Sequence, residues 1–403
     1  MAHYRTRHAL DLIENALKLS PLVGVIGHRQ VGKTTLLERI ATTYHVLDTQ
    51  EVRQEAETHP HQFIKKRAGK RVALDECQFV PALFPELKEW VRTHKQPGQF
   101  LLSGSVRFSS REAIRESLTG RIVQVELLPL TLSEVLELPL SDEFPRLLDL
   151  QRFKPDVFRS NRNAWPKIHT ASEKYFEAGG LPGVCFLRDE KQRTLRLEDQ
   201  LLTILDRDLR MVRKIQLALT DLKNLAAALS QMQGQALDYS QLKAKTGIST
   251  PTIKKVIASL EAVFVIRLIP IEGGRASTTT LQFEDVAERN HLAGNIPDRN
   301  ETFSHLCFHE CRSQLQYQIG RSWNVSQYAT RGGARIPWVF KSRDMTLGVV
   351  PILKPNEIDR MMGSIRSFFS HYGPSKVLVI HPGTEAPRVL TEKLAVVPLA
   401  ALV

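Results

Sequence analysis

The chain has 403 residues, of which 42% are hydrophobic and 24% are charged. This length suggests two or three domains, and the composition excludes a wholly disordered chain, a collagen-like chain and a polytopic membrane protein. Lys and Arg number 55 against 43 Asp and Glu, which gives a net charge of +12. Such an excess favours polyanionic partners without indicating where they bind.

The positive charge is unevenly distributed along the chain. Residues 1–150 carry 20 basic and 19 acidic residues, whereas residues 151–403 carry 35 and 24. The start of the chain is amphipathic without the pattern of a signal peptide, and no apolar run reaches the roughly 18 residues of a membrane-spanning helix. Four cysteines in a chain of this length do not form a disulfide framework. We therefore expect a cytoplasmic protein with no membrane partner.

A phosphate-binding loop follows the first apolar run, residues 22–26. Residues 27–35 read GHRQVGKTT, which fits the pattern G-x-x-x-x-G-K-[ST] between a predicted strand and a predicted helix. The glycines let successive backbone N–H groups face a phosphate chain, and the helix adds the positive end of its dipole. We expect Lys33 to reach the β- and γ-phosphates and the Thr34 hydroxyl to ligate Mg²⁺. The predicted ATP-binding residues are Gly27, Gln30, Val31, Gly32, Lys33, Thr34 and Thr35.

Paired acids end a second buried strand, residues 71–74. Asp75 is expected to hold Mg²⁺ through water, and Glu76 to polarise the attacking water. A third strand, residues 100–102, ends in the tripeptide Ser-Gly-Ser, whose last residue is Ser105. A hydroxyl there could hydrogen-bond the γ-phosphate or orient the water, although this tripeptide is also ordinary turn chemistry.

Arg121 lies between a predicted helix, residues 109–118, and a predicted strand, residues 122–127. An arginine at such a corner could act on the nucleotide of a neighbouring subunit, as an arginine finger does. The spacing alone fits equally well a surface arginine beside an acidic helix.

These motifs resemble a large prokaryotic group of AAA+ ATPases that carry a C-terminal domain of the DUF4143 type. The resemblance implies a five-stranded parallel ATPase sheet, with Arg121 as the finger and Ser105 as the sensor. His28 stands where the group often has proline, and Cys77 where it has an aliphatic residue; neither departure removes a phosphate or metal contact. The segments that carry the resemblance are residues 23–37, 74–78 (LDECQ), 102–105 (LSGS), 117–121 (SLTGR), 128–130 (LPL), 179–182 (GGLP) and 206–208 (DRD).

The middle of the chain predicts a helical lid and then a winged-helix domain. Helices are expected at residues 222–231, 239–246 and 250–262, followed by a strand at 264–269, which is a helix–turn–helix with a β-strand. If this domain reads DNA, its third helix presents Thr252, Lys254, Lys255 and Ser259 outward. A module that packs between ATPase subunits is the alternative.

The resemblance extends more loosely into the last third of the chain, as a restriction-endonuclease-like fold that has lost its chemistry. An active version needs several carboxylates around its metal ions. Glu310 and Lys354 match the outer positions of such a site, but the strand at 334–340 has no acid and Ile352 stands where a glutamate is needed. We therefore predict no nuclease activity.

Two further patterns in this region have competing interpretations. His305, Cys307, His309 and Cys311 contain ligand types for zinc, but on a helix the cysteines share one face and the histidines another, which favours buried cysteines in a packed helix. Five basic residues between 321 and 343 alternate with Trp323, Tyr328 and Trp338. This second pattern suits either nucleic acid or a solvated sheet face.

The predicted fold is α/β, with a P-loop AAA+ parallel-sheet core (1–130), a helical lid (131–215), a winged-helix domain (216–275) and a degenerate nuclease-like α/β domain (276–403). The predicted function is hydrolysis of ATP with Mg²⁺ by a homo-oligomer, expected to be a hexameric ring, that moves or remodels branched or duplex DNA. The alternative function is a nucleotide-gated switch or scaffold for a protein partner, in defence or regulation, with slow hydrolysis.

Overall fold

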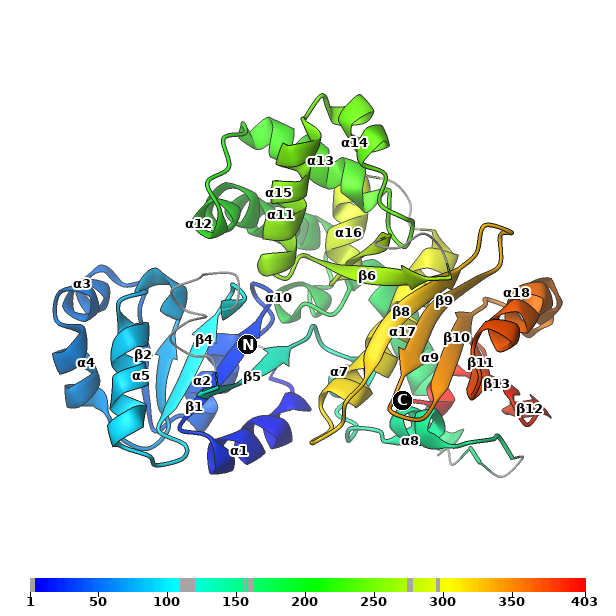
Figure 1. The fold of residues 1–403 in the computed structure, drawn as a ribbon, viewed down its shortest axis with the longest axis horizontal. Coiled ribbons are helices and arrows are strands. Elements are labelled where there is room, and N and C mark those ends of the chain that lie inside the picture. Colours follow the sequence, from blue (N-terminus) through cyan, green and yellow to red (C-terminus); the bar gives the residue numbers. More distant parts are fainter. Residues whose placement is uncertain (1–3, 109–119, 155–156, 159–161, 274–277, 295–297) are drawn as a thin grey trace.

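The computed structural model describes residues 4–108, 120–154, 157–158, 162–273, 278–294 and 298–403. The chain forms three lobes, which Figure 1 shows as an amino-terminal lobe in blue and cyan, a helical lobe in green and a carboxy-terminal sheet lobe in yellow to red. The helix predicted at 109–118 lies outside the described residues. No helix in the described part of the chain is long and apolar enough to cross a membrane.

The amino-terminal lobe contains the expected five-stranded parallel sheet, in the order β2-β3-β4-β1-β5. Alternate residues of a strand face opposite sides, so Val23 and Val25 pack toward α1 and α2, whereas Leu22 and Ile26 pack toward α4 and α5. The strands are β1 (Leu22–Gly27), β2 (Thr43–Val46), β3 (Val72–Asp75), β4 (Phe100–Gly104) and β5 (Ile122–Leu127), and the helices are α1 (Ala9–Leu19), α2 (Lys33–Ile40), α3 (Gln50–Thr58), α4 (Pro60–Arg67) and α5 (Leu83–Thr93).

The helical lobe is built around one apolar core that contains the three helices of the predicted winged-helix domain. The π-helical turn Ile204–Asp208 and α12 contribute to the same core. The helices of the lobe are α11 (Glu190–Thr203), α12 (Leu209–Val212), α13 (Leu219–Ser230), α14 (Tyr239–Thr246) and α15 (Thr250–Ala262). After α15, strands β6 (Ile266–Glu272) and β7 (Thr279–Phe283) form an antiparallel hairpin, and α16 (Val286–Ala293) follows β7.

The hairpin also belongs to the third lobe, because β6 pairs in parallel with β8 and so extends an eight-stranded sheet in the order β12-β13-β11-β10-β9-β8-β6-β7. The expected boundary between residues 275 and 276 lies outside the described residues, between two strands that pair with each other. Helix α17 (Arg299–Gln316) packs on Leu378 and Ile380 of β11, and α18 (Ile358–His371) packs on Val377 and Val379. The remaining strands are β8 (Asn324–Ala329), β9 (Arg335–Lys341), β10 (Thr346–Pro351), β11 (Ser375–His381), β12 (Arg388–Thr391) and β13 (Leu394–Pro398).

The helices of residues 131–215, expected to form one lid, pack in two different places. Helices α7 (Leu132–Val135), α8 (Glu143–Asp149) and α9 (Trp165–Ala178) share the core of α17 in the third lobe. Helices α11 and α12 belong to the helical lobe, and α10 (Pro182–Cys185) lies between the two groups. Single 3₁₀ turns span Cys77–Phe79, Arg162–Ala164, Pro355–Glu357 and Leu399–Ala401.

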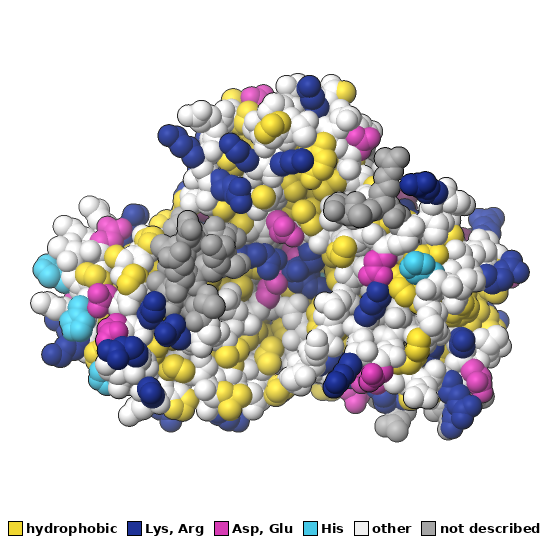
Figure 2. Space-filling view, viewed as in Figure 1, with side chains coloured by type: hydrophobic (Ala, Val, Ile, Leu, Met, Phe, Trp, Pro, Cys, Tyr) yellow, Lys and Arg dark blue, Asp and Glu magenta, His cyan; other side chains and the backbone are white. Residues whose placement is uncertain are grey.

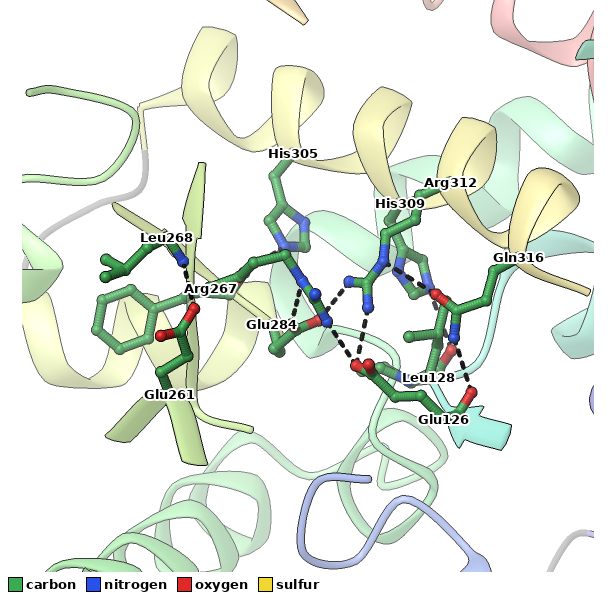
Figure 3. Close-up of polar contacts among 12 residues, drawn as sticks. Glu126, Leu128, Glu261, Arg267, Leu268, Glu284, His305, His309, Arg312 and Gln316 are labelled. Carbon is green, nitrogen blue, oxygen red and sulfur yellow. Dashed lines mark hydrogen bonds and ion pairs between the residues drawn. The ribbon is translucent and has the colours of Figure 1, made fainter. Parts of the chain in front are cut away.

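A cluster of ion pairs between two buried and two half-buried residues ties the three lobes together (Figure 3). Glu126 of β5 accepts from Arg312 of α17 at 2.8 Å and from Arg267 of β6, and Glu284, after β7, accepts from the same two arginines at 2.7 and 2.8 Å. Burial alone would raise the pKa of Glu284, but the two guanidinium groups outweigh burial and lower it. Charged groups, as well as apolar surface, therefore hold the lobes in this arrangement.

Candidate active site

The loop after β1 has a backbone suited to close contact with an anion. A Cβ atom on Gly27 would lie 2.4 Å from the carbonyl oxygen of Leu127, so this position has no room for a side chain. Gly32 has a φ of 99° and precedes Lys33, the first residue of α2. The unpaired N–H groups at the start of α2 therefore face the loop, where a phosphate group would meet them.

Lys33 lies over this loop and is buried. Its Nζ donates to the carbonyl oxygens of Gly27 at 3.0 Å and His28 at 2.9 Å. Burial lowers the pKa of Lys33, while the carboxylates of Glu76 and Asp75 oppose that shift. Phosphate oxygens would be stronger acceptors than these two carbonyl oxygens. The ammonium group of Lys33 is therefore placed to give up its carbonyl partners for the phosphates of a bound nucleotide.

Thr34 and Asp75 bring two oxygen donors together at the carboxyl ends of β1 and β3. Thr34 Oγ1 donates to Asp75 Oδ2 at 2.7 Å, and the hydroxyls of Ser103 and Tyr44 donate to the same carboxylate. Mg²⁺ at nucleotide sites uses one or two protein oxygens together with phosphate and water oxygens, and this donor set fits that requirement. Among the residues with described positions, no three His, Cys, Asp or Glu side chains gather to hold a metal by themselves.

Glu76 directly follows β3 in a left-handed backbone conformation, with φ of 57°. Its N–H donates to Asp75 Oδ1 at 3.0 Å, and its carboxylate accepts from the amide of Gln78. The same amide nitrogen donates to Ser105 Oγ at 3.1 Å, so the two residues predicted as base and sensor share one neighbour. Burial raises the pKa of Glu76, with Lys33 opposing, and a base with a raised pKa accepts a proton more readily.

A cavity of about 550 Å³ opens beside the loop, within the range of small-molecule sites. Its wall includes the apolar side chains of Tyr4, Phe186 and Leu187, which could contact a nucleotide base. This wall was not predicted from the sequence. The nearest sequence motif is Gly-Gly-Leu-Pro at 179–182, whose last residue also lines the cavity. The cavity is lined by Tyr4, Arg5, Arg7, Arg29, Gln30, Gly32, Lys33, Thr34, Thr35, Leu36, Glu76, Leu130, Pro182, Gly183, Phe186 and Leu187.

Two predicted nucleotide-binding residues have roles in shaping the loop. Gln30 has a left-handed φ of 60° and lines the cavity. Val31 is buried, and its carbonyl oxygen accepts from Arg7 Nη1 at 2.7 Å. Arg7 also pairs with the buried carboxylate of Glu134 at 3.1 Å. The segment before α1, in which no motif was found, therefore holds the loop from outside.

Arg121 lies at the opposite end of the sheet from the loop. It precedes β5, and the parallel pairing of Ile122 with Leu22 places it level with the start of β1. Six residues of strand, at about 3.3 Å each, separate this level from the loop, which is about 20 Å. The chain therefore does not bring Arg121 to its own nucleotide site.

The structure places the predicted DNA-binding residues on α15 of the helical lobe. Lys254 and Lys255 are exposed, and Figure 2 shows Lys and Arg side chains gathered on this lobe. Thr252 is half-buried, with its hydroxyl 2.9 Å from that of Ser249. The prediction that Ser259 faces outward is wrong: it is buried and donates to the Lys255 carbonyl oxygen at 3.0 Å. Its place three residues after the inward Val256 puts it on the buried side of the helix.

The candidate nuclease residues do not come together. Glu310 is buried in α17, accepts from the backbone N–H of Leu132 at 2.7 Å, and has a pKa that burial raises to about 8. Lys354 is exposed after β10. Two of the three aromatic residues of the basic stretch, Tyr328 and Trp338, are buried and do not present a stacking surface to nucleic acid, whereas Trp323 is half-buried.

Helix α17 also separates the four candidate zinc ligands. His305 and His309 hydrogen-bond through Nε2 to the carbonyl oxygens of Phe283 and Pro129, at 3.0 and 3.1 Å. Cys307 and Cys311 lie on another side of the helix, in the apolar core, where burial raises the pKa of both thiols. The two residue types therefore occupy different faces, as the spacing predicts.

Comparison with known proteins gives two family matches. Residues 19–136 match an AAA domain, and residues 169–295 match a domain of unknown function, DUF8612. The expected DUF4143-type domain is not confirmed, because the match after the ATPase core is to DUF8612 instead. That match ends before α17, so it covers the helical lobe and the β6–β7 hairpin but not most of the third lobe.

Curated relatives and a solved structure add context. Uncharacterized proteins of Mycobacterium bovis and Mycobacterium tuberculosis are each 23% identical over 325 residues, which is 79% of this chain and 63% of each relative. A signal transduction ATPase with numerous domains (STAND) from Pyrococcus horikoshii, which has a tetratricopeptide repeat sensor, matches with a TM-score of 0.28 and 12% identity over 77% of this chain and 44% of that one. The AAA-domain match and the five-stranded parallel sheet agree: residues 19–136 have the fold of a P-loop ATPase core of the AAA type.

Proposed function

We propose that this protein binds ATP with Mg²⁺ at the loop after β1, hydrolyses it, and acts as a homo-oligomer on DNA. The observation that carries the hydrolytic part is that Lys33, Thr34 and Glu76 line one cavity, and that Asp75 accepts a hydrogen bond from Thr34 beside it. Lys33 and the start of α2 hold the phosphates, while Tyr4 and Phe186 face the base. A site with one region for the phosphates and another for the base fits a nucleoside triphosphate better than a small free anion.

Hydrolysis would proceed in line on the γ-phosphate. Mg²⁺, held by Thr34 and Asp75, would neutralise charge on the β- and γ-phosphates. Glu76, fixed through Asp75 and Gln78, would orient a water and accept its proton. Ser105, bonded to the same Gln78, would report the state of the γ-phosphate to that glutamate.

Oligomerisation completes the proposed site. Because Arg121 lies about 20 Å of strand away from its own loop, it would act only on the nucleotide of an adjacent copy. A closed ring, which we expect to be hexameric, gives every copy the same pair of surfaces. The arginine of each copy would then complete the next site around the ring.

DNA is the proposed partner of the helical lobe. Helix–turn–helix packing is present in α14 and α15, and the exposed lysines of both helices would contact phosphate groups. Thr252 would lie at the amino-terminal end of the same face. The exposed cations of this lobe are Lys191, Arg196, Arg207, Arg210, Arg213, Lys214, Lys223, Lys243, Lys245, Lys254 and Lys255.

A nucleotide-gated switch or scaffold for a protein partner is the second candidate function. The observation that favours it is the direct contact of the phosphate-binding loop with α16, outside the ATPase sheet. A switch needs nucleotide-dependent contacts of this kind, whereas a motor needs DNA-stimulated turnover as well.

The deciding experiment measures ATP turnover with single-stranded, duplex, forked and four-way DNA, alongside the oligomeric mass. We expect DNA to stimulate turnover and binding to weaken steeply with salt, by about 0.9 log units per phosphate contact for each log unit of salt. The Lys254→Ala/Lys255→Ala variant should lose the stimulation while keeping basal turnover. Turnover that no DNA changes, in a protein that still hydrolyses ATP, would favour the switch.

A further inference from the structure

His28, inside the phosphate-binding loop, contacts a residue 260 positions later in the chain. Its Nε2 lies 3.0 Å from Oε2 of Glu288 on α16, and both side chains are buried, with exposed fractions of 1% and 0%. The other oxygen of Glu288 accepts from Gln200 Nε2 of α11 at 3.1 Å. One carboxylate thus joins the loop to two helices outside the ATPase sheet.

The next residue of the loop has a similar contact. Arg29 Nη1 lies 3.3 Å from Oδ2 of Asp208, a buried residue of the helical lobe that also pairs with Arg207 at 3.1 Å. Two consecutive loop residues are therefore held by acids from beyond the ATPase sheet. If those two acids move, the two loop residues that they hold are expected to move with them.

The contact at His28 is directly connected to the phosphate-binding lysine. The carbonyl oxygen of His28 accepts from Lys33 Nζ at 2.9 Å. A displacement of His28 toward or away from α16 therefore moves one of the two groups that hold Lys33. Burial opposes protonation of His28, but Glu288 outweighs burial and raises the pKa of the imidazole. Both side chains are shielded from water, so separating them leaves a buried charged or polar group without its partner, which costs free energy.

Helix α16 reaches the nucleotide cavity from a second side. Asp285 caps α16 through the N–H groups of Ala287 and Glu288, and it also accepts from the N–H of Gly180 at 2.7 Å. Gly180 lies two residues before Pro182, which lines the nucleotide cavity. One short helix is thus attached both to the phosphate end of the site and to the segment that forms its wall.

We propose that Glu288 is a positioning residue of the nucleotide site, which sets the phosphate-binding loop through His28 and makes nucleotide affinity depend on the docking of α16 and α11. By linkage, nucleotide binding stabilises that docking to the same degree. This inference rests on the proposed binding of ATP at the loop. It adds that the loop is assembled by residues outside the AAA domain.

The test measures the dissociation constant of a fluorescent ATP analogue for the full chain and five variants. We expect Glu288→Ala and His28→Ala each to weaken binding about tenfold, and the double variant to be no weaker than the worse single variant, because both remove one contact. Glu288→Gln keeps an acceptor and should recover part of the affinity. The control Glu301→Gln removes the negative charge that pairs with Arg289 of α16 without touching the loop, and its affinity should stay within twofold of the original.

Hydrogen exchange gives a readout that does not depend on substituting Glu288. Saturating nucleotide should slow exchange in α16 and α11 of the unmodified chain, and His28→Ala should abolish that slowing while nucleotide remains bound. Unchanged exchange in both helices, additive losses in the double variant, or variants that lose thermal stability but keep full affinity would each overturn the inference. A chain that binds no ATP at all would instead overturn the proposed function.

Discussion

Glu76 is half-buried and Glu310 is fully buried; burial raises the pKa of both carboxyl groups, but they lie in regions with opposite surroundings. Glu76 stands at the open end of a parallel sheet, beside Lys33, Asp75 and a cavity of about 550 Å³. Glu310 lies within α17, where one backbone N–H is its hydrogen-bond donor and the surrounding side chains are largely apolar. An acid whose pKa is raised by burial therefore becomes a candidate catalyst when a cation and an accessible space accompany it, and the raised pKa alone does not suffice.

The first prediction removes the cation from the first region. Lys33→Ala should abolish measurable nucleotide binding, because the neutral side chain offers the phosphates no charge-assisted hydrogen bond. Binding of a fluorescent ATP analogue checks this, with the exposed Lys65→Ala as control. Normal affinity in Lys33→Ala would show that the cavity is not the ATP site.

The second prediction concerns the shared site. Arg121→Ala should lower turnover by about 10³-fold while leaving ATP affinity unchanged, since an arginine finger stabilises charge that develops during the reaction. Mixing this variant with Lys33→Ala should restore part of the turnover, because some interfaces then combine an intact loop with an intact arginine. Unchanged turnover in Arg121→Ala would reject a site shared between subunits.

The third prediction removes the base and keeps the shape. Glu76→Gln should reduce turnover by about 10²- to 10⁴-fold, the usual contribution of a general base, and should retain bound ATP that can be recovered intact. Quantifying ATP and ADP on the isolated protein separates slow chemistry from poor binding. Turnover equal to that of the unmodified chain would remove Glu76 from the mechanism.

The fourth prediction tests the second region through stability. The Glu310 carboxyl group, with a pKa of about 8 in the folded chain, keeps its proton at pH values where the unfolded chain has released it. The free energy of unfolding therefore falls as the pH rises from the ordinary pKa of a glutamate to about 8. Glu310→Gln cannot ionise and still accepts from Leu132, so at pH 7 it should raise the free energy of unfolding by up to about 3 kcal/mol. Urea unfolding at pH 5.5, 7 and 8.5 checks this. A gain that does not grow with pH would contradict the buried-acid interpretation, and ATP turnover should not change.

The smallest expected effect is an absence of cleavage. With Mg²⁺ or Mn²⁺, the unmodified protein and Glu310→Gln should leave duplex, forked and four-way DNA intact, because Glu310 and Lys354 lack a shared metal site. Gel analysis over several hours is sufficient. Metal-dependent cleavage that survives a change of preparation would show that the third lobe retains nuclease chemistry.

The parts of the site that lie within short sequence motifs were predictable. The Lys33 loop and the Asp75–Glu76 pair are contiguous in sequence, and each follows a recognisable buried strand, so their positions at one sheet edge follow from parallel pairing. The five-stranded parallel sheet is confirmed. The assignment of Ser259 failed because one helical position, about 100° of rotation, separates a surface residue from a buried one.

Contacts between distant segments could not be predicted. The spacing of apolar residues in α7 and α9 shows which face of each helix is buried. It does not show that this face packs against the third lobe instead of the ATPase sheet. Neither Phe186 at the cavity wall nor Glu288 beside His28 belongs to a motif. The alternation of Trp338 with basic residues suits a nucleic-acid surface. The same alternation also arises when one face of a strand belongs to the core, so the sequence pattern cannot distinguish the two cases.

The double pairing of β6 has a practical consequence for dissecting the protein. Ile271 and Glu272 pair with β8, while the rest of β6 pairs with β7. An expression fragment that begins at residue 276 would expose the edge of β8 as an open template for intermolecular pairing and aggregation. A soluble carboxy-terminal fragment must therefore include β6, which also carries Arg267 of the ion-pair cluster, so the helical and sheet lobes are best produced as a single piece.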